Sequence, residues 1–300
     1  MAASGIVLVD KPGGMTSHDV VARARKGLGT RKIGHAGTLD PMATGLLVLG
    51  VEGATRLLTF LVGLDKTYEA TIRLGVSTDS DDADGIETAR ADAAAIAAVT
   101  PEGIAEGIAA LTGPISQVPS TVSAIKVGGR RAYDLAREGV EVTLKARDVT
   151  VSRFAVLRTT GAPDRIDLDV VIDCSSGTYI RALARDLGAA LGVGGHLTAL
   201  RRTRVGPFDV ANAASIDHLA DGPFLSPAEV ASAVLGRVDV TAEEAQDLRH
   251  GKRLTGAAAR MDGDTAGAVD PAGELVGILE RRGADLKSAM NMPNTAGGAS

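Results

Sequence analysis

Apolar and polar positions along the chain predict a mixture of strands and helices. Strands are predicted where a short run is apolar or alternates with polar residues, at 5–10, 46–49, 68–74 and 165–174. Helices are predicted where apolar residues recur with helical spacing, at 17–28, 91–111 and 178–191. Ser17 is the expected N-cap of the first helix, and Pro101 is expected to interrupt the second. The pattern therefore predicts a mixed α and β fold.

The pattern becomes looser and richer in turns toward the C-terminus. A capped helix is predicted at 240–250, and two short strands within 266–280 flank an Asp-Pro-Ala-Gly turn. We therefore expect a main domain over 1–235, a small β-rich domain over 236–282 and a disordered tail over 283–300.

Composition narrows the class of protein. Its 300 residues, 45% of them hydrophobic, suffice for a main domain and a small one. No apolar stretch approaches the roughly 20 residues that span a bilayer, and the N-terminus lacks a basic region followed by a long apolar run. We therefore expect a cytoplasmic protein that does not bind membranes. Cys174 is the single cysteine, and the histidines are scattered without the spacing of a zinc site, so we expect no metal.

The charge is unevenly distributed. A net charge of −5 disfavours binding of nucleic acid over the whole surface. Within residues 11–35, however, six basic residues accompany Asp19, which gives a local charge of about +5. Arg201, Arg202 and Arg204 form a second basic cluster with no acid near them in the sequence. Such patches can attract phosphates, although ordinary solvated faces would also account for them.

A glycine-rich run from Lys32 to Gly45 (KIGHAGTLDPMATG) places one carboxylate, Asp40, among small and turn-forming residues. The glycines permit tight backbone turns, and Pro41 disfavours helix at the residue before it, so we expect a rigid loop. An aspartate in such a loop is commonly an Asx-turn or cap residue. Only the other motifs of the chain can distinguish that role from catalysis.

Three further segments accompany this loop, namely KPGGMTS at 11–17, KTYEA at 66–70 and SGTYIR at 176–181. In order and spacing, the four segments resemble the tRNA pseudouridine synthase B (TruB) family, of the bacterial stand-alone type. The resemblance covers about residues 5–280 and includes the intervening segment QVPSTVSAIKVGGRRAYDLAREG. It implies the pseudouridine synthase fold, which is α+β with a mixed, largely antiparallel central sheet and flanking helices, and a small C-terminal PUA-like RNA-binding domain.

The resemblance also implies a function and a site. The function is isomerisation of a uridine in the T-loop of transfer RNA, conventionally position 55, to pseudouridine. Asp40 matches the catalytic aspartate, and substrate-binding positions are matched by His35, Tyr68, Tyr179, Arg181, Leu200, Lys11 and Asp82. In the family, Tyr68 would stack on the base, Arg181 would pair with Asp40, and His35 would lie beside the flipped-out nucleotide. Taken alone, each tyrosine could equally be a core residue and His35 a structural hydrogen-bonding residue.

Physical chemistry agrees with a single carboxylate. The isomerisation breaks the N1–C1′ bond, turns the uracil, joins C5 to C1′ and removes the C5 proton, without redox change or net hydrolysis. Neither a cofactor nor a metal is required. Glycoside hydrolysis usually uses two carboxylates, whereas this reaction must keep water out. A guanidinium beside Asp40 would lower its pKa and keep it ionised.

The expected partner is the T-arm of transfer RNA, with no obligatory protein partner and a monomeric state. The segment 117–147 is basic, and in the family it is an insertion that folds over the T-loop; we expect it to be mobile without RNA. Further RNA contacts are expected from Lys32, Lys126, Arg130, Arg131, Arg201, Arg202 and Arg204. Two alternatives stay open, an RNA-binding chaperone with the same fold and a synthase that acts on another RNA.

Overall fold

The computed structural model describes residues 4–120, 126–127, 130–131, 144–219 and 222–293. Its chain divides into two compact units. Unit 1 consists of Met1–Asp40, Gly45–Val62 and Gly206–Ser300, and unit 2 consists of Pro41–Thr44 and Gly63–Val205. Unit 1 is thus assembled from separate stretches of the chain, whereas unit 2 is almost entirely one continuous stretch.

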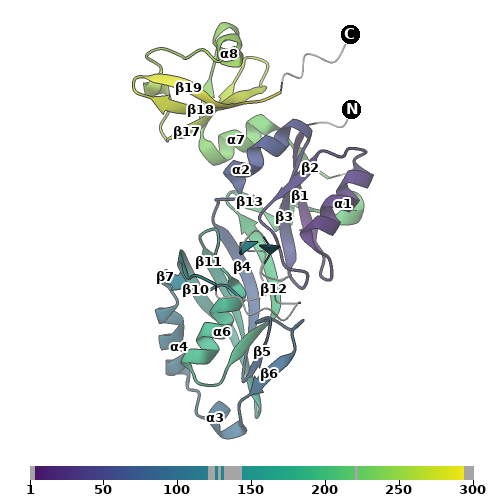
Figure 1. The fold of residues 1–300 in the computed structure, drawn as a ribbon, viewed down its shortest axis with the longest axis vertical. Coiled ribbons are helices and arrows are strands. Elements are labelled where there is room, and N and C mark those ends of the chain that lie inside the picture. Colours follow the sequence, from purple (N-terminus) through teal and green to yellow (C-terminus); the bar gives the residue numbers. More distant parts are fainter. Residues whose placement is uncertain (1–3, 121–125, 128–129, 132–143, 220–221, 294–300) are drawn as a thin grey trace. The chain divides into compact units, whose positions relative to one another are not determined.

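Unit 2 is built on an antiparallel sheet in the order β12–β4–β11–β10–β7. The strands are β4 (Lys66–Leu74), β7 (Gly113–Gln117), β10 (Arg147–Ala162), β11 (Arg165–Cys174) and β12 (Gly195–Val205). Helices α4 (Pro101–Ala110) and α6 (Ile180–Ala190) cover one face of this sheet (Figure 1). Along β4, alternate residues from Tyr68 to Leu74 are buried while Glu69 is exposed, as expected for a strand with one covered face.

Smaller elements surround this sheet. They are the hairpin of β5 (Val76–Thr78) and β6 (Glu87–Arg90), the short helix α3 (Ala93–Ala97), and the paired strands β8 (Lys126–Val127) and β9 (Arg130–Arg131). The loop between β5 and β6 returns to the sheet, because Asp82 forms an isolated bridge with Leu197 of β12.

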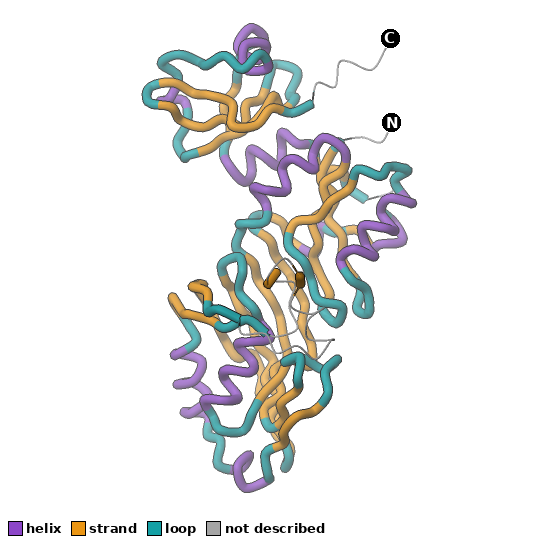
Figure 2. Tube along the Cα trace, in the orientation of Figure 1, coloured by secondary structure: helices purple, strands orange, loops and turns teal. Residues whose placement is uncertain are grey.

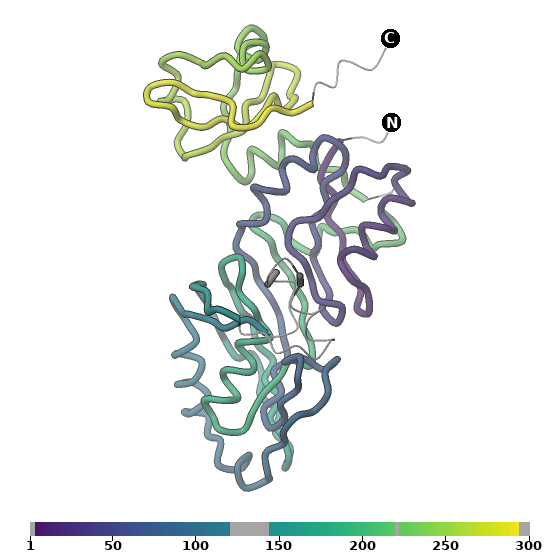
Figure 3. The backbone as a smooth tube through the Cα atoms, in the orientation of Figure 1, coloured from purple at the N-terminus to yellow at the C-terminus, as the bar shows by residue number. Residues whose placement is uncertain are grey.

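The first part of unit 1 is a mixed sheet around β1 (Gly5–Lys11). This strand is antiparallel to β3 (Thr44–Val51) and β15 (Phe224–Leu225) and parallel to β14 (Ala214–Ser215), while β2 (Ile33–Ala36) pairs with β3. The N-terminal strand therefore lies beside residues more than 200 positions later in the sequence, as the purple and green segments in Figure 3 show.

Helices complete this part of unit 1. Helix α1 (Ser17–Gly27) buries Val20, Val21 and Ala24, which pack with β1, β2 and β3 in one apolar core. The remaining elements are η1 (Glu52–Leu57), α2 (Leu58–Leu61), β13 (Phe208–Asp209), η2 (Val210–Asn212), η3 (Ile216–His218) and α7 (Pro227–Leu235).

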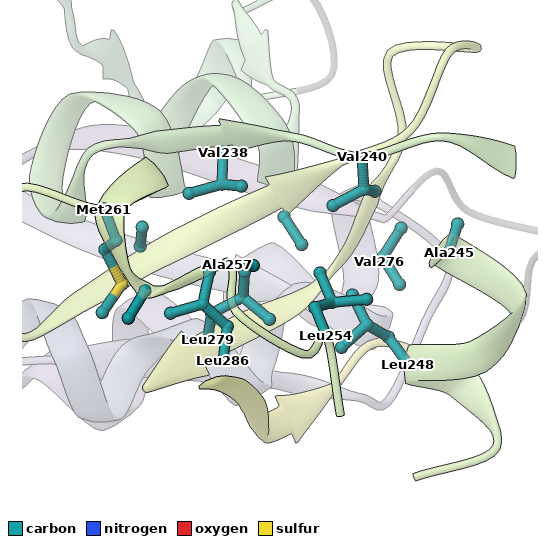
Figure 4. Close-up of a cluster of buried hydrophobic side chains, with 13 residues drawn as sticks. Val238, Val240, Ala245, Leu248, Leu254, Ala257, Met261, Val276, Leu279 and Leu286 are labelled. Carbon is teal, nitrogen blue, oxygen red and sulfur yellow. The ribbon is translucent and has the colours of Figure 1, made fainter. Parts of the chain in front are cut away.

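The C-terminal part of unit 1 has its own sheet, in the order β16–β17–β18–β19. The strands are β16 (Arg237–Asp239), β17 (Thr265–Val269), β18 (Leu275–Arg282) and β19 (Asp285–Asn291), with helix α8 (Ala242–Arg249) and the turn η4 (Ala258–Arg260). Their apolar side chains form a separate core, in which Leu254, Leu279 and Leu286 meet Leu248 of the helix (Figure 4). This part of the chain therefore has the hydrophobic core of a small domain.

The structure confirms the α+β class, with helices and strands along the chain (Figure 2). The strand pairs are largely antiparallel. The interruption expected near Pro101 is confirmed, because the segment 91–111 forms two helices and Pro101 begins the second. Two expectations are corrected. Thr16, not Ser17, caps α1, because its side chain accepts a hydrogen bond from Asp19 N.

The second correction concerns the tail. Residues expected to be disordered form β19, which pairs with β18 from Arg282 opposite Asp285 to Gly277 opposite Asn291. Leu286 is the one buried residue of this strand, so the sequence of β19 lacks the apolar alternation that would have predicted it. Residues 294–300 lie outside the described part of the chain. In the part that is described, no helix has the length and apolar character required to cross a membrane.

Candidate functional site

Asp40 lies in the loop between β2 and β3 and is partly exposed. The residue before it is held on both sides of its peptide backbone by one side chain. Ser17 Oγ accepts a hydrogen bond from Leu39 N (2.9 Å) and donates one to Leu39 O (3.2 Å). Because Ser17 is fully buried in the first turn of α1, the hydroxyl fixes the backbone next to Asp40 to a rigid helix. This Ser17–Leu39 bracket was not predicted, because sequence spacing assigned Ser17 to capping.

The glycines around Asp40 have the conformations that the loop requires. Gly37 and Gly45 both have positive φ, at 78° and 99°, where a side chain would be strained. Gly34 lies against α2, and a Cβ at that position would be 2.9 Å from Leu58 Cδ1. The expectation of a tightly turning loop is confirmed.

Two other expected site residues lie in unit 1. Lys11 is fully buried, and its Nζ donates hydrogen bonds to Pro12 O (2.9 Å) and Met15 O (2.7 Å), which closes the turn between β1 and α1. His35, on β2, meets His18 edge to face, with ring centroids 5.5 Å apart. Lys11 therefore shapes the backbone that leads to Ser17.

In unit 2, the register of the sheet brings expected residues to one face. On adjacent strands β4 and β12, Tyr68 is opposite Arg202, and Ala70 is opposite Leu200. Residues opposite each other, or two apart on one strand, share a face, so Tyr68, Leu200 and Arg202 lie on the face that packs against α6. Tyr68 and Leu200 are each 7% exposed.

The first turn of α6 carries Tyr179 and Arg181. Tyr179 is the N-cap residue, and its backbone is bound twice by the side chain of Gln117, the last residue of β7. Tyr179 N donates to Gln117 Oε1 (2.8 Å), and Gln117 Nε2 donates to Tyr179 O (3.0 Å). This pairing was not predicted, since Gln117 lies far from Tyr179 along the chain.

Arg181 and Asp82 form a buried ion pair. Arg181 Nη1 lies 3.2 Å from Asp82 Oδ2 and donates a hydrogen bond to Ser80 O (2.8 Å). The other carboxylate oxygen of Asp82 accepts from Ser80 Oγ (2.6 Å) and Asp84 N (3.1 Å). Breaking a buried pair of this kind leaves an uncompensated charge, so each partner holds the other in place. The expected pairing of Asp40 with Arg181 would join the two units and stays a prediction.

The basic cluster at the end of β12 does not lie wholly on the surface. Arg202 is 1% exposed, which argues against a direct contact with RNA phosphate. Arg204 donates to Thr67 Oγ1 (2.9 Å) and lies 4.0 Å from Asp173 Oδ1, so an acid does lie near the cluster, from a strand distant in the sequence. Arg201 Nη1 reaches Thr44 Oγ1 at 3.5 Å.

The other expected RNA contacts have mixed outcomes. Lys32 is exposed, just before β2. For Lys126, Arg130 and Arg131, the backbone forms β8 and β9, whereas their side chains lie outside the description. The expected mobility of the segment 117–147 likewise falls mainly on residues that are not described.

Two buried titratable groups lie at the adjoining ends of β4 and β11. Burial, together with the positive charge of Arg202, lowers the pKa of Lys66 to about 8. Burial likewise raises the pKa of Cys174 to about 11. Lys66 Nζ donates a hydrogen bond to Leu64 O. Among the residues described, no cluster of His, Cys, Asp and Glu could hold a metal ion.

Comparison with known proteins identifies the family. The model of the TruB family pseudouridylate synthase N-terminal domain matches residues 25–180. The tRNA pseudouridylate synthase B C-terminal domain matches 181–238, and the tRNA pseudouridine synthase II C-terminal domain matches 235–293. Together these matches cover nearly all of the chain.

Whole proteins and solved structures agree with the family models. The tRNA pseudouridine synthase B of Leifsonia xyli subsp. xyli is 57% identical over 98% of both chains, and that of Mycobacterium sp. (strain KMS) is 56% identical over 92% of both. An H/ACA RNP bound to a substrate RNA containing 2′-deoxyuridine has a chain that is 25% identical with a TM-score of 0.70, over 97% of this chain and 85% of that one. A chain of a Cbf5–Nop10–Gar1 complex is 26% identical with a TM-score of 0.67, over 92% and 78%. The protein belongs to the TruB family and is an RNA pseudouridine synthase that modifies transfer RNA.

Proposed function

We propose that this enzyme isomerises the T-loop uridine of transfer RNA, taken out of the base stack, with Asp40 as the sole catalytic carboxylate. The observation that carries the proposal is the Ser17–Leu39 bracket beside Asp40. It holds the backbone next to a partly exposed carboxylate in a defined position, as required of a group that must react with one particular atom of the substrate.

The target base would be received by unit 2. Flipping a base out of a stacked loop costs a few kcal/mol, and stacking on an aromatic side chain returns about 1–3 kcal/mol. Tyr68 would provide that stack, and Leu200 would contribute an apolar wall from the same sheet face. Tyr179, fixed by Gln117, would line the pocket as well.

Arg181 would control the ionisation of Asp40. A carboxylate that loses water on substrate binding tends to take up a proton, and a nearby guanidinium opposes this by lowering its pKa. The ion pair with Asp82 supports this role, because it holds the guanidinium at a defined position before the substrate binds. His35 would lie beside the displaced nucleotide, and Lys11 would act indirectly by shaping the turn that leads to Ser17.

The RNA partner would be the T-arm, bound in part through basic residues such as the exposed Lys32 and the half-buried Arg201. We further propose a cytoplasmic monomer without an obligatory protein partner and without a cofactor. The main domain would cover 1–235, and the small domain, extended to include β19, would bind RNA from about residue 236 onward.

The test uses an unmodified T-arm stem-loop transcript and carbodiimide mapping of pseudouridine. The wild-type enzyme is expected to convert the T-loop uridine, and Asp40→Asn and Asp40→Ala are expected to abolish conversion while the Kd for the transcript changes little. Asp164→Asn, at an exposed hairpin, is the control and should retain full activity.

The outcomes separate the alternatives. Substantial turnover by a clean Asp40→Asn preparation would contradict the assignment of Asp40. A wild-type enzyme that promotes tRNA folding but never modifies the T-loop would favour the chaperone alternative. Conversion at another uridine alone would favour a different RNA target.

A further inference from the structure

Two arginines one turn apart on α6 bind the same short loop. Residues four apart on a helix lie on the same side, and Arg181 and Arg185 have this spacing. Arg181 binds Ser80 O and the Asp82 carboxylate, and Arg185 Nη1 lies 3.2 Å from Asp81 Oδ2. Consecutive acids of the loop between β5 and β6 are thus each held by a different arginine.

The loop itself is tightly constrained. Asp81 has a φ of 61°, a left-handed conformation that is uncommon outside glycine. Its carbonyl oxygen accepts a hydrogen bond from Leu197 N on β12 (3.0 Å). Gly85 closes the loop so tightly that a Cβ there would lie 2.2 Å from Ser80 Oγ and 3.0 Å from Ser80 N. Because the backbone of this loop is held in an uncommon conformation, side-chain contacts are needed to keep Asp82 in place for Arg181.

Arg185 also binds a second structural element. Its Nη2 donates to Val118 O (2.7 Å), the first residue after β7, and its Nε donates to Asp186 Oδ1 (2.9 Å). Gln117, one residue earlier, is bound to the N-cap of α6. The beginning of the segment 117–147 is therefore attached to α6 at two points, one of which is Arg185.

The contact with Asp81 is more than a surface ion pair. The Asp81 side chain is 12% exposed, and burial raises the pKa of its carboxyl, while the charges of Arg185 and, to a smaller extent, Arg181 act in the opposite direction. Exposed ion pairs contribute little, whereas removal of one partner of a buried carboxylate leaves that group without its counter-charge.

We propose that Arg185 is a positioning residue, which fixes the Asp81–Asp82 loop, and with it the Asp82–Arg181 pair, to the start of the segment that follows β7. The inference rests on the proposed role of Arg181 at the target uridine. A guanidinium suits this task because its planar fork donates in several directions at once; a lysine ammonium keeps the charge but lacks that fork.

Three variants test the proposal. Arg185→Ala removes all contacts, Arg185→Lys keeps the charge without the fork, and Asp186→Asn is the matched control, since Asp186 contacts Arg185 but is not bound to the loop or to Val118. Single-turnover rates on tRNA, Kd for tRNA, thermal unfolding and amide hydrogen exchange over 79–86 are measured for each.

Arg185→Ala is expected to lower the single-turnover rate about tenfold or more, as misplacement of a binding group does, while Kd changes less than about threefold. Exchange at the loop amides, including Ile86 N and Asp84 N, should accelerate, and Arg185→Lys should show an intermediate effect on both. Asp186→Asn should resemble the wild type.

A rate for Arg185→Ala within about twofold of the wild type overturns the proposal, as does unchanged exchange over 79–86. If Arg185→Ala does not fold, the same two measurements on Arg185→Lys decide. The exchange measurement needs no substrate, so it tests the positioning role of Arg185 even if the T-loop uridine is not the target. Failure of the proposed function would instead appear as absent T-loop conversion by the wild type.

Discussion

The carboxylate of Asp40 depends on a hydroxyl far away in the sequence. The Ser17 hydroxyl both accepts a hydrogen bond from and donates one to the backbone of Leu39, and both residues are buried. A single hydroxyl thereby satisfies two buried backbone groups, which would otherwise cost free energy. At this position one side chain serves both the stability of the fold and the placement of the reactive group.

Ser17→Ala is therefore expected to reduce the free energy of unfolding by about 1–3 kcal/mol and to lower turnover about tenfold or more. The control is Thr16→Ala, which removes the N-cap of the same helix and costs about 1 kcal/mol of stability but leaves the Ser17–Leu39 bracket intact. Denaturant unfolding and single-turnover assays measure both effects. Equal turnover in the two variants would show that the bracket does not position Asp40.

Lys66 should give the stability of the protein a distinct pH dependence. Its pKa is about 8 in the folded protein against 10.5 for an ordinary lysine, so between these values the unfolded chain holds the additional proton. Raising the pH through this window therefore stabilises the folded state, by at most about 1.4 kcal/mol per pH unit.

Lys66→Met should abolish this contribution. Unfolding free energies of the wild type and the variant, measured from pH 7 to 10, should differ in slope, with the wild type gaining stability relative to the variant above about pH 8. Parallel curves would mean that Lys66 keeps its ordinary pKa.

At the scale of elements, α6 approaches the turn before β12 without side chains between them. A Cβ at Gly188 would lie 2.2 Å from Gly194 C and 2.3 Å from Gly195 N, both backbone atoms. The backbone of the helix that carries Arg181 and Arg185 thus contacts the glycine backbone before β12 directly. The helix can lie this close to the sheet because Gly188 has no Cβ.

Gly188→Ala should consequently destabilise the protein by about 1–3 kcal/mol, as overpacking does, and should also reduce turnover because α6 must move. Gly103→Ala, on α4, is the matched control. A Cβ there meets atoms only at 3.5 Å and beyond, so the substitution should stabilise by about 0.5–1 kcal/mol through helix propensity. Thermal unfolding of both variants checks the opposite signs.

The elements also show what sequence patterns can and cannot reveal. The alternation in β11 predicted a strand, and Pro101 predicted an interruption of the helical segment 91–111; the structure confirms both. The bonds from Ser17 to Leu39 and from Gln117 to Tyr179 were not predictable, because each joins residues that only the completed fold brings together. Asp173 beside Arg204 was missed for the same reason, since cross-strand neighbours depend on register.

On the scale of the whole molecule, the positively charged side chains are unevenly distributed along the chain. The chain carries a net charge of −5, yet the stretch around α1 is strongly basic. Many other arginines are already neutralised in the fold, such as Arg73 by Asp167 and Arg260 by Glu244. Among the residues that the structure describes, binding of RNA should therefore depend on exposed cations such as Lys32.

Lys32→Ala should weaken RNA binding and reduce the slope of log Kd against log salt by about 0.7–0.9, the contribution of one phosphate contact. Arg90→Ala is the control, because Arg90 is already paired with Glu87 and Asp164. Binding isotherms for the T-arm transcript at several salt concentrations measure both slopes. An unchanged slope for Lys32→Ala would remove this residue from the RNA contacts.

Unit 1 is assembled from separate stretches of the chain, and this affects the order in which the protein can fold during translation. In β1, Val9 pairs with Ala214, and Val7 pairs with Phe224, so this strand obtains its late neighbours only after the chain past Leu225 has left the ribosome. The sheet of unit 2 is complete once Val205 has emerged. During translation, the sheet of unit 2 can therefore form first. The apolar strand β1 is translated at the outset, yet its full set of partner strands becomes available only after the sheet of unit 2 is complete.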